Sequence, residues 1–448
     1  MASVIINEKD YTESTAYEPT DTIVYIPGMP GEDCADTSSL VNTPTLFSSV
    51  EDFVGALGTK PKILSGTEET MVTSCDKSYV MAKQLLALGV KVLYEVVAQD
   101  ENNLTVPAST KSELLNRLSS SSHWAKLYDR ALYNPRFLTS GGYESIWSYS
   151  GLDSEGQEYK AYNTSIALNM LECAHFTAAQ DGINHIGRGD CVALIDHVIN
   201  LTDVDDIAEL FNQGLSNIQD LGTFGSAFTP WCSHSLTVDT GYISPDDQIA
   251  GTWALPGSFT YLAAYATAIA SSPTWYAAAG VTRGASPTLV KPLVEFGERA
   301  AASLQSREDG FIAINPICKI VPYGYRVYGN RTLRQNGLNN KSDLVATSFL
   351  NIRNLVSDIK KTSFAACRRM AFEQNTDVLW TNLKAQIVPL LDRMQTGNGI
   401  EGYKMIRVPT QKKATVIGRI RIIPIEAVED FILTVELTDS LEIETESE

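Results

Sequence analysis

The stretch Lys77–Val97 reads KSYVMAKQLLALGVKVLYEVV and decides the fold expected for this chain. Its first part, Lys77–Leu88, has the pattern of a helix, and Gly89 ends it because glycine readily takes the conformation found just past helix ends. The second part, Val90–Val97, is an apolar run typical of a buried strand. A helix that passes through a glycine into a buried strand predicts a sheet covered by helices.

The segments before this stretch carry similar signals. Thr22–Gly28 (TIVYIPG) predicts a strand that a Pro-Gly turn ends. Phe47–Leu57 places apolar residues at helical intervals, with Ser49 as the N-cap and Gly58 just past the end. A strand and a helix are therefore expected in the part of the chain that precedes Lys77.

The alternation continues towards the middle of the chain. Three segments predict helices and two predict short strands, in the order helix Ser112–Arg130, strand Pro135–Thr139, helix Thr164–Gln180, strand Cys191–Ile195 and helix Asp203–Gln213. Short apolar strands alternating with amphipathic helices predict a parallel sheet covered on both faces, which is the α/β class. Residues 215–290 are rich in Gly, Pro and Ser, and predict long connections with one Ala-rich helix, Tyr261–Ala270.

The pattern of apolar residues changes in roughly the last 140 residues, where longer helices are expected. Leu344–Arg369 has apolar residues at helical spacing and predicts a long amphipathic helix. A second helix is expected from Thr376 to Thr396, with Pro389 as a kink. Arg419–Ile422 then alternates between basic and apolar residues, as a half-buried strand does.

Apolar and acidic residues alternate at the end of the chain. The apolar positions of this strand pattern are Phe431, Leu433, Val435, Leu437, Leu441 and Ile443. Such a strand is an aggregation hazard unless it is paired, and addition to a sheet of another subunit is the physical remedy. A basic segment precedes it, with Lys404, Arg407, Lys412, Lys413, Arg419 and Arg421. Opposite charges on adjoining strands favour pairing by roughly a few tenths of a kcal/mol per pair; the alternative is that both segments are ordinary solvated faces.

Bulk composition narrows the class of protein. The chain has 448 residues, 44% hydrophobic and 20% charged, which suits two or three globular domains. Its net charge of −18 argues against a nucleic-acid coat, which needs a basic surface. The seven cysteines are scattered with no C-x-x-C pair, so free thiols in a reducing cytoplasm are expected. We find no signal peptide and no apolar run long enough to cross a membrane.

Motifs for catalysis are missing from the sequence. Its five histidines are His123, His175, His185, His197 and His234, and no G-x-S-x-G motif accompanies them. No phosphate-binding glycine loop is present, Asp203–Asp206 lacks the remainder of a calcium loop, and Arg188–Asp190 spells an adhesion tripeptide by coincidence. We therefore predict no catalytic, cofactor or metal site. An α/β enzyme whose site is assembled from scattered residues stays open as a distant alternative.

Nine segments, in order along the whole chain, resemble the tail sheath family of contractile phages and related injection systems. Each match is short, and their order makes the resemblance specific. The segments are Ile26–Gly28 with Phe47–Phe53 and Gly58, Leu85–Val97, Phe224–Trp231, Leu255–Ser258 with Trp275–Gly284, Ile314–Ile317, Tyr328–Leu333, Phe349–Arg353, Phe372–Asn375 with Trp380, and Pro424–Phe431.

The resemblance implies a division of the chain into five parts. These are an N-terminal arm (1–21), an N-terminal α/β part (22–98), a mid-chain α/β domain (99–305), a C-terminal α/β sheath domain (306–428) and a C-terminal strand arm (429–448). In this family the mid-chain domain is subtilisin-like without the protease site. The arms are extended strands that add to a small sheet in neighbouring protomers.

The resemblance also implies a mechanical function without any cofactor. Protomers would form stacked hexameric rings around an inner tube protein, with baseplate and tail terminator proteins at the two ends. Contraction would drive the tube through a cell envelope, without nucleic-acid binding or membrane insertion by the sheath. A virion tail assembled in the host cytoplasm is expected, with a cell-borne or extracellular injection system as the alternative. The helix 376–396 would face the tube through Lys384 and Arg393.

Overall fold

An eight-stranded sheet forms the centre of the computed structural model. The residues that the structure describes are 22–64, 75–145, 148–152, 158–161, 164–178, 185–196, 207, 215, 218–238, 252–305, 312–334, 346–410 and 415–427. The strand order is β15 (Gly324–Val327), β14 (Asn315–Ile320), β10 (Gly225–Thr229), β9 (Val192–Asp196), β4 (Phe137–Leu138), β1 (Ile23–Gly28), β3 (Lys91–Val96) and β2 (Thr45–Phe47). The six strands from β14 to β3 run parallel, and β15 and β2 are antiparallel edges.

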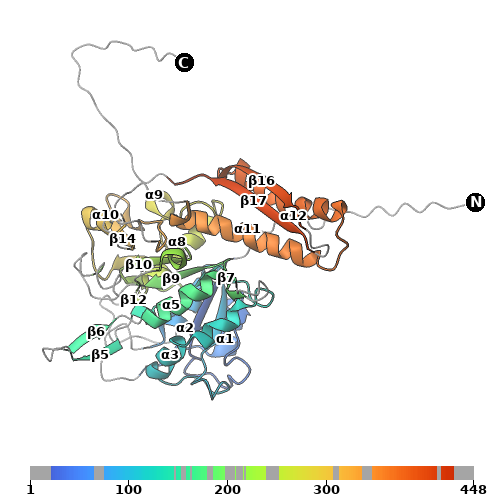
Figure 1. The fold of residues 1–448 in the computed structure, drawn as a ribbon. Coiled ribbons are helices and arrows are strands. Elements are labelled where there is room, and N and C mark those ends of the chain that lie inside the picture. The colour runs from blue at the N-terminus through green and yellow to red at the C-terminus, as the bar shows by residue number, and fades with distance from the viewer. Residues whose placement is uncertain are drawn as a thin grey trace, which may run out of the picture.

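Both faces of this sheet are buried under helices, as the sequence predicted (Figure 1). In β1, Val24 and Ile26 join one apolar cluster while Tyr25 between them joins the other, because successive strand residues point to opposite faces. One cluster includes side chains of α1 (Val50–Leu57), α2 (Lys77–Ala87) and α8 (Gly257–Ile269); the other includes those of α3 (Lys111–Leu118), α4 (Ser121–Ala125), α5 (Thr164–Ala174) and α10 (Glu298–Gln305). We call the sheet and these helices the α/β body.

The predicted helix ends near the start of the chain are confirmed. Ser49 caps α1, its hydroxyl accepting a hydrogen bond from Asp52 N at 3.1 Å, and Gly58 follows the helix with φ +88°. Gly89, between α2 and β3, has φ +80°, a conformation that glycine adopts without a steric penalty. Local signals were sufficient here because capping depends on neighbouring residues.

Two helices predicted between residues 112 and 180 are shorter in the structure. Ser112–Arg130 is broken into α3, α4 and a 3-10 turn, Lys126–Tyr128. The hydroxyls of Ser120 and Ser122 bond to Glu101 Oε1 at 2.6 and 2.8 Å, where serine competes with helix continuation. The helix expected to reach residue 180 ends at Ala174 because the last carbonyls of α5 accept from the backbone after the next hairpin.

Smaller elements complete the described body. They are the sheet β12 (Thr252–Leu255), β11 (Cys232–Ser235), β13 (Leu289–Pro292); the hairpins β5 (Ser148–Leu152)–β6 (Glu158–Ala161) and β7 (Phe176–Ala178)–β8 (His185–Gly187); the helices α7 (Gln219–Gly222) and α9 (Gly280–Arg283); and the 3-10 turns Tyr143–Ser145 and Ala346–Ser348. The Ala-rich helix α8 begins at Gly257, four residues before the predicted start. The predicted helix 203–213 lies outside the described residues, apart from residue 207.

The C-terminal module consists of α11 (Leu350–Arg369), α12 (Asp377–Thr396) and the hairpin β16 (Ile400–Val408)–β17 (Ile417–Pro424). It lies beside the α/β body, with the hairpin on the side away from the large sheet (Figure 1). The helix α12 has the predicted bounds within one residue, and Thr376 caps it by accepting a hydrogen bond from Leu379 N at 3.3 Å. Strand β16 was not predicted.

Helix α11 ties this module to the α/β body. Lys361 Nζ donates to the carbonyl of Pro135 at 2.6 Å and to Asn134 Oδ1 at 2.7 Å. Asp358 forms a buried ion pair with Arg136 at the start of β4. Charged side chains on the buried side of α11 therefore fix the module relative to the sheet.

The five-part division of the chain stays a prediction. Strands from the ranges 22–98, 99–305 and 306–428 all belong to the same eight-stranded sheet. The mixed α/β class is clear, whereas a subtilisin-like mid-chain domain remains an expectation. The two arms, 1–21 and 429–448, lie outside the described residues.

Candidate assembly surface

The hairpin β16–β17 presents two different faces. On the inner face Tyr403 Oη donates to Asp392 Oδ1 of α12 at 2.5 Å, and Arg407 pairs with Asp377 at 2.8 Å. Gly418 lies against the Trp380 ring, where an added Cβ would come within 3.2 Å of the ring. This face is therefore held on α12 by both polar and aromatic contacts.

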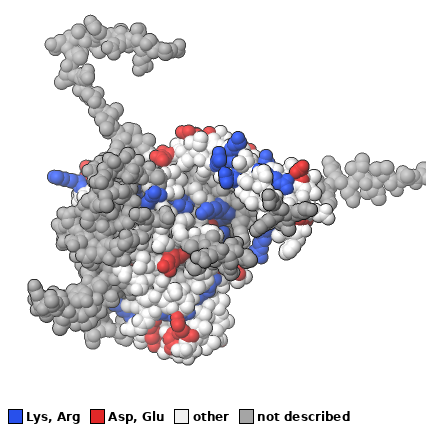
Figure 2. Space-filling model, in the orientation of Figure 1, with Lys and Arg blue, Asp and Glu red and all other residues white. Residues whose placement is uncertain are grey.

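The outer face combines cations with exposed aliphatic side chains. Its exposed members are Lys404, Ile417, Arg419, Arg421 and Ile423. Lys404 lies directly opposite Arg421 in the ladder, and like charges in that position destabilise a hairpin. Figure 2 shows Lys and Arg side chains gathered over this part of the molecule. An acidic, partly apolar partner would relieve the repulsion and cover the isoleucines.

The edges of the hairpin are also open. Within the described part of the chain this sheet has two strands, so the outer edge of each has no ladder partner. Two strands alone are marginally stable, and open edges are templates for pairing with another chain. The predicted arm residues Phe431, Leu433, Val435, Leu437, Leu441 and Ile443 lie outside the described residues, so their pairing stays a prediction.

The predicted tube-facing residues are both on α12 but do not lie together. Lys384 is half-buried, with Nζ 5.8 Å from the centre of the Trp380 ring, whereas Arg393 lines a cavity towards the α/β body. Nine residues separate them, about two and a half turns, so they project from opposite sides of the helix. The apolar face of α12 packs inward through its buried residues Leu383, Ile387, Leu390, Leu391 and Met394.

Polar residues fill the position where open α/β sheets usually bind ligands. That position is the carboxyl end of β1 and β4, where the strand order changes direction. Asp76 there accepts from Met29 N at 2.7 Å and from Tyr143 Oη at 2.6 Å, and is completely buried. A Cβ on Gly141 would clash with Ser78 Oγ at 1.9 Å, so no open cleft separates these segments.

Two further buried carboxyls lie along the same edge. Asp196 accepts from Ser258 N at 2.7 Å and Ser258 Oγ at 2.6 Å, at the start of α8. Glu144 accepts from Asp196 N at 2.8 Å and contacts Ser140. Burial raises the pKa of Asp196 to about 7, and burial together with the nearby Asp196 charge raises the pKa of Glu144. These groups join β9, the loop after β4 and α8, which is a structural role.

The histidines with described side-chain bonds are buried among neutral partners or ion pairs. His234 lies between Thr288 and Thr260, both at 2.9 Å, and burial lowers its pKa to about 3. The tripeptide 188–190 is buried, with Arg188 and Asp190 paired at 3.0 Å, so it offers no adhesion loop. Among the described residues no His, Cys, Asp or Glu cluster could hold a metal ion, and no described helix is long and apolar enough to cross a membrane.

Sequence reasoning missed the main part of this surface. In β16 the inward apolar residues are Tyr403 and Met405. An alternation of apolar and polar residues from Ile400 onward could have indicated the strand. Gly402 interrupts that pattern, at an irregularity in the ladder. The opposition of Lys404 and Arg421 depends on the register, which no local pattern fixes.

Comparison with known proteins finds proteins that are similar to this chain in sequence or in fold. No family model matches the chain. The tail sheath protein of Vibrio phage KVP40 is 25% identical over 167 residues, which span 37% of this chain and 22% of the phage protein.

Solved structures agree with the fold over almost the whole chain. The sheath complex of PVC, an extracellular contractile injection system, in its contracted state has a TM-score of 0.59 and 14% identity, covering 98% of both chains. The contracted helical sheath of the anti-feeding prophage (AFP) has a TM-score of 0.57 and 14% identity, covering 98% of this chain and 99% of that one. A chain of the AFP baseplate structure also has a TM-score of 0.57. These comparisons confirm the resemblance to contractile tail sheath proteins that the sequence motifs indicated.

Proposed function

We propose that this chain is the protomer of a contractile sheath. It polymerises as stacked hexameric rings around an inner tube, and contraction drives the tube through a cell envelope. The observation that carries the proposal is the agreement of fold over 98% of the chain with two contracted sheaths. The phage sheath relative supports the same function from sequence.

The outer face and open edges of β16–β17 supply the physical basis for polymerisation. The C-terminal arm of a neighbouring protomer adds to one edge, and its acidic residues meet Lys404, Arg419 and Arg421. Each protomer would give its arm to the hairpin of one neighbour and would receive the arm of another neighbour on its own hairpin. Each contact therefore joins two different surfaces, the arm and the hairpin. Contacts of this kind generate rings or helical polymers.

The setting is either a phage tail or an extracellular injection system. The sequence relative favours a virion tail assembled in the host cytoplasm, and the fold relatives favour an extracellular machine. The match to a baseplate structure supports contact with baseplate proteins, and the tube and terminator are further partners of this proposal. Capsid and terminase genes beside this gene would identify the phage setting.

The buried residues at the carboxyl end of β1 and β4 disfavour the distant alternative of an enzyme.

Removal of residues 429–448 tests the proposed assembly contact. We expect the truncated chain to remain folded and monomeric in sedimentation velocity, under conditions in which the full chain forms large polymers. A matched control replaces Glu436, Glu442 and Glu444 with glutamine at full length, and should polymerise more weakly than the unmodified chain. Normal polymerisation of the truncated chain would show that the arm does not join protomers.

A further inference from the structure

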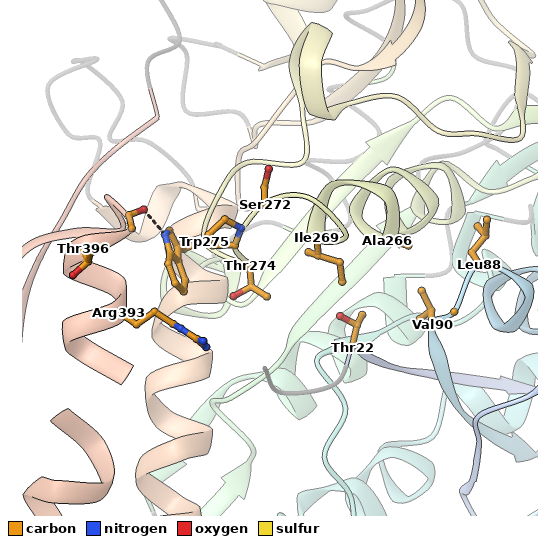
Figure 3. Close-up of a pocket in the computed structure, with 13 residues that line it drawn as sticks. Thr22, Leu88, Val90, Ala266, Ile269, Ser272, Thr274, Trp275, Arg393 and Thr396 are labelled. Carbon is orange, nitrogen blue, oxygen red and sulfur yellow. Dashed lines mark hydrogen bonds between the residues drawn. The ribbon is translucent and has the colours of Figure 1, made fainter. Parts of the chain in front are cut away.

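A cavity of about 700 Å³ lies between the α/β body and the C-terminal module (Figure 3). Its walls come from the start of β1, the turn between α2 and β3, the end of α8 with the loop after it, and the last turn of α12. Trp275 closes one side, its Nε1 donating to Gly397 O at 3.0 Å. Arg393 extends from α12 toward Thr274. The cavity therefore separates the two parts of the molecule that α11 joins elsewhere.

The first strand of the central sheet starts at the edge of this cavity. Thr22, which precedes β1, lines the cavity, and its carbonyl accepts from Lys91 N at 3.2 Å. The next carbonyl, of Ile23, accepts from Arg136 N at 2.7 Å, so β1 is fixed between its two neighbours. Consecutive Cα atoms are about 3.8 Å apart, so the chain that precedes Thr22 has to start from the wall of the cavity.

The cavity lining suits the residues that precede Thr22. Thr22 Oγ1 is buried and has no hydrogen-bond partner within the described part of the chain, and such groups ordinarily have one. Leu88, Val90 and Ile269 supply apolar walls, and Arg393 supplies the one charged side chain among the lining residues. The preceding residues are Tyr17-Glu18-Pro19-Thr20-Asp21, which offer an aromatic ring and two carboxylates. Five extended residues reach about 17 Å, enough to cross a cavity of this size.

We infer that residues 17–21 of the same chain occupy this cavity, with the acidic side chains facing Arg393 and Tyr17 against the apolar wall. The base of the N-terminal arm is then held between the α/β body and α12. Residues 1–16 remain to reach other protomers. This docking does not depend on the proposed sheath function. If the chain is a sheath protomer, a force that pulls on the arm would also act on α12.

Hydrogen exchange of the unpolymerised protein tests the docking. The variants compared are the full chain, a deletion of residues 2–16 that keeps the docking residues, and a deletion of residues 2–21 that removes them. We expect exchange in 272–275 and 393–397 to be unchanged by the first deletion and roughly tenfold faster after the second. Amides of β9 report whether the sheet stays folded. Equal exchange in all three proteins would overturn the inference.

Two full-length variants keep the test decisive if the longer deletion disturbs β1. Arg393→Glu should accelerate exchange in the same segments, and combining it with Glu18→Arg and Asp21→Arg should restore protection. Failure of the triple variant to restore it would contradict the charge pairing. Protection should also be independent of protein concentration. Protection that increases with concentration would identify a second copy as the occupant and overturn docking within one chain.

Discussion

Glu144 and Asp196 hold the loop after β4, the end of β9 and the start of α8 together. Burial raises the pKa of Asp196 to about 7, and the pKa of Glu144 is raised by burial and then by Asp196. Folded Asp196 thus keeps a proton up to about pH 7, whereas an unfolded aspartate releases it near pH 4. Its contribution to stability is therefore greatest below about pH 4 and is lost as pH rises to about 7.

Replacing Glu144 with glutamine should weaken this pH dependence. Glu144 itself keeps its proton in the folded state at pH values where an unfolded glutamate has released it, because burial and the Asp196 charge raise its pKa. The glutamine does not titrate, so the loss of stability that Glu144 causes between pH 5 and pH 8 disappears. Urea unfolding of both proteins at the two pH values measures the difference. Glu51→Gln on exposed α1 is the control, and an unchanged pH dependence in E144Q would count against the assignment.

Lys384 and Arg393 remain predicted tube contacts, and for Arg393 this prediction is an alternative to pairing with the acidic residues of 17–21. Reversing both charges should weaken assembly on the tube protein while tubeless polymers still form, because exposed ion pairs contribute about 0–1 kcal/mol each and act together only when repeated around a ring. Since the two residues project from opposite sides of α12, the single variants Lys384→Glu and Arg393→Glu separate the contributions. Co-sedimentation with the tube protein measures them. Equal co-sedimentation of the double variant and the unmodified chain would mean that neither residue contacts the tube.

At the scale of elements, the hairpin β16–β17 carries a like-charge repulsion that destabilises it in the monomer. The cations of Lys404 and Arg421 face each other across the ladder. The inner face is well packed, with Trp380 against Gly418 and Tyr403 bonded to Asp392. The repulsion is thus confined to the face that the proposed arm would cover.

Lys404→Glu should therefore have opposite effects on folding and on assembly. An opposite-charge pair with Arg421 raises monomer stability by about a few tenths of a kcal/mol, while an acidic arm is repelled and polymerisation slows. Thermal unfolding of the monomer and light scattering during assembly measure the two effects. Lys60→Glu, on an exposed lysine outside the module, is the control. Faster assembly of K404E would contradict an acidic partner for this face.

Elements were predictable from sequence where local chemistry determined them. The caps at Ser49 and Thr376 and the glycine ends of α1 and α2 needed no tertiary information. The break at Ser119–Ser122 and the end of α5 depend on bonds to distant residues, and sequence patterns missed both. The outer face was missed for the same reason, because its charges meet only through the hairpin register.

At the scale of the whole molecule, the reactivity of the thiols reports which cysteine side chains are buried. The seven cysteines form no disulfide in the structure; Cys367 is exposed, Cys34 is half-buried and the other five are buried. Thiol titration should therefore detect seven groups in denaturant, and two should react readily in the native monomer. Recovery of fewer than seven in denaturant without reductant would show a disulfide and contradict a reducing compartment.

The molecule as described joins the α/β body to a module whose two-stranded sheet has open edges. Lys361 and the Arg136–Asp358 pair hold α11 against the α/β body, and α11 therefore holds the C-terminal module in place. A protomer of this kind can keep its own fold while neighbouring copies share strands. That combination suits a polymer whose subunits change packing without unfolding.

Electron microscopy of the purified full-length chain tests the sheath assignment most directly. Negative-stain images at increasing protein concentration should show hollow tubes built of stacked rings, and end-on views should average to six-fold symmetry. Addition of the tube protein should produce longer, thinner sheaths with the tube inside. A chain that stays monomeric at all concentrations, with and without the tube protein, would contradict the account.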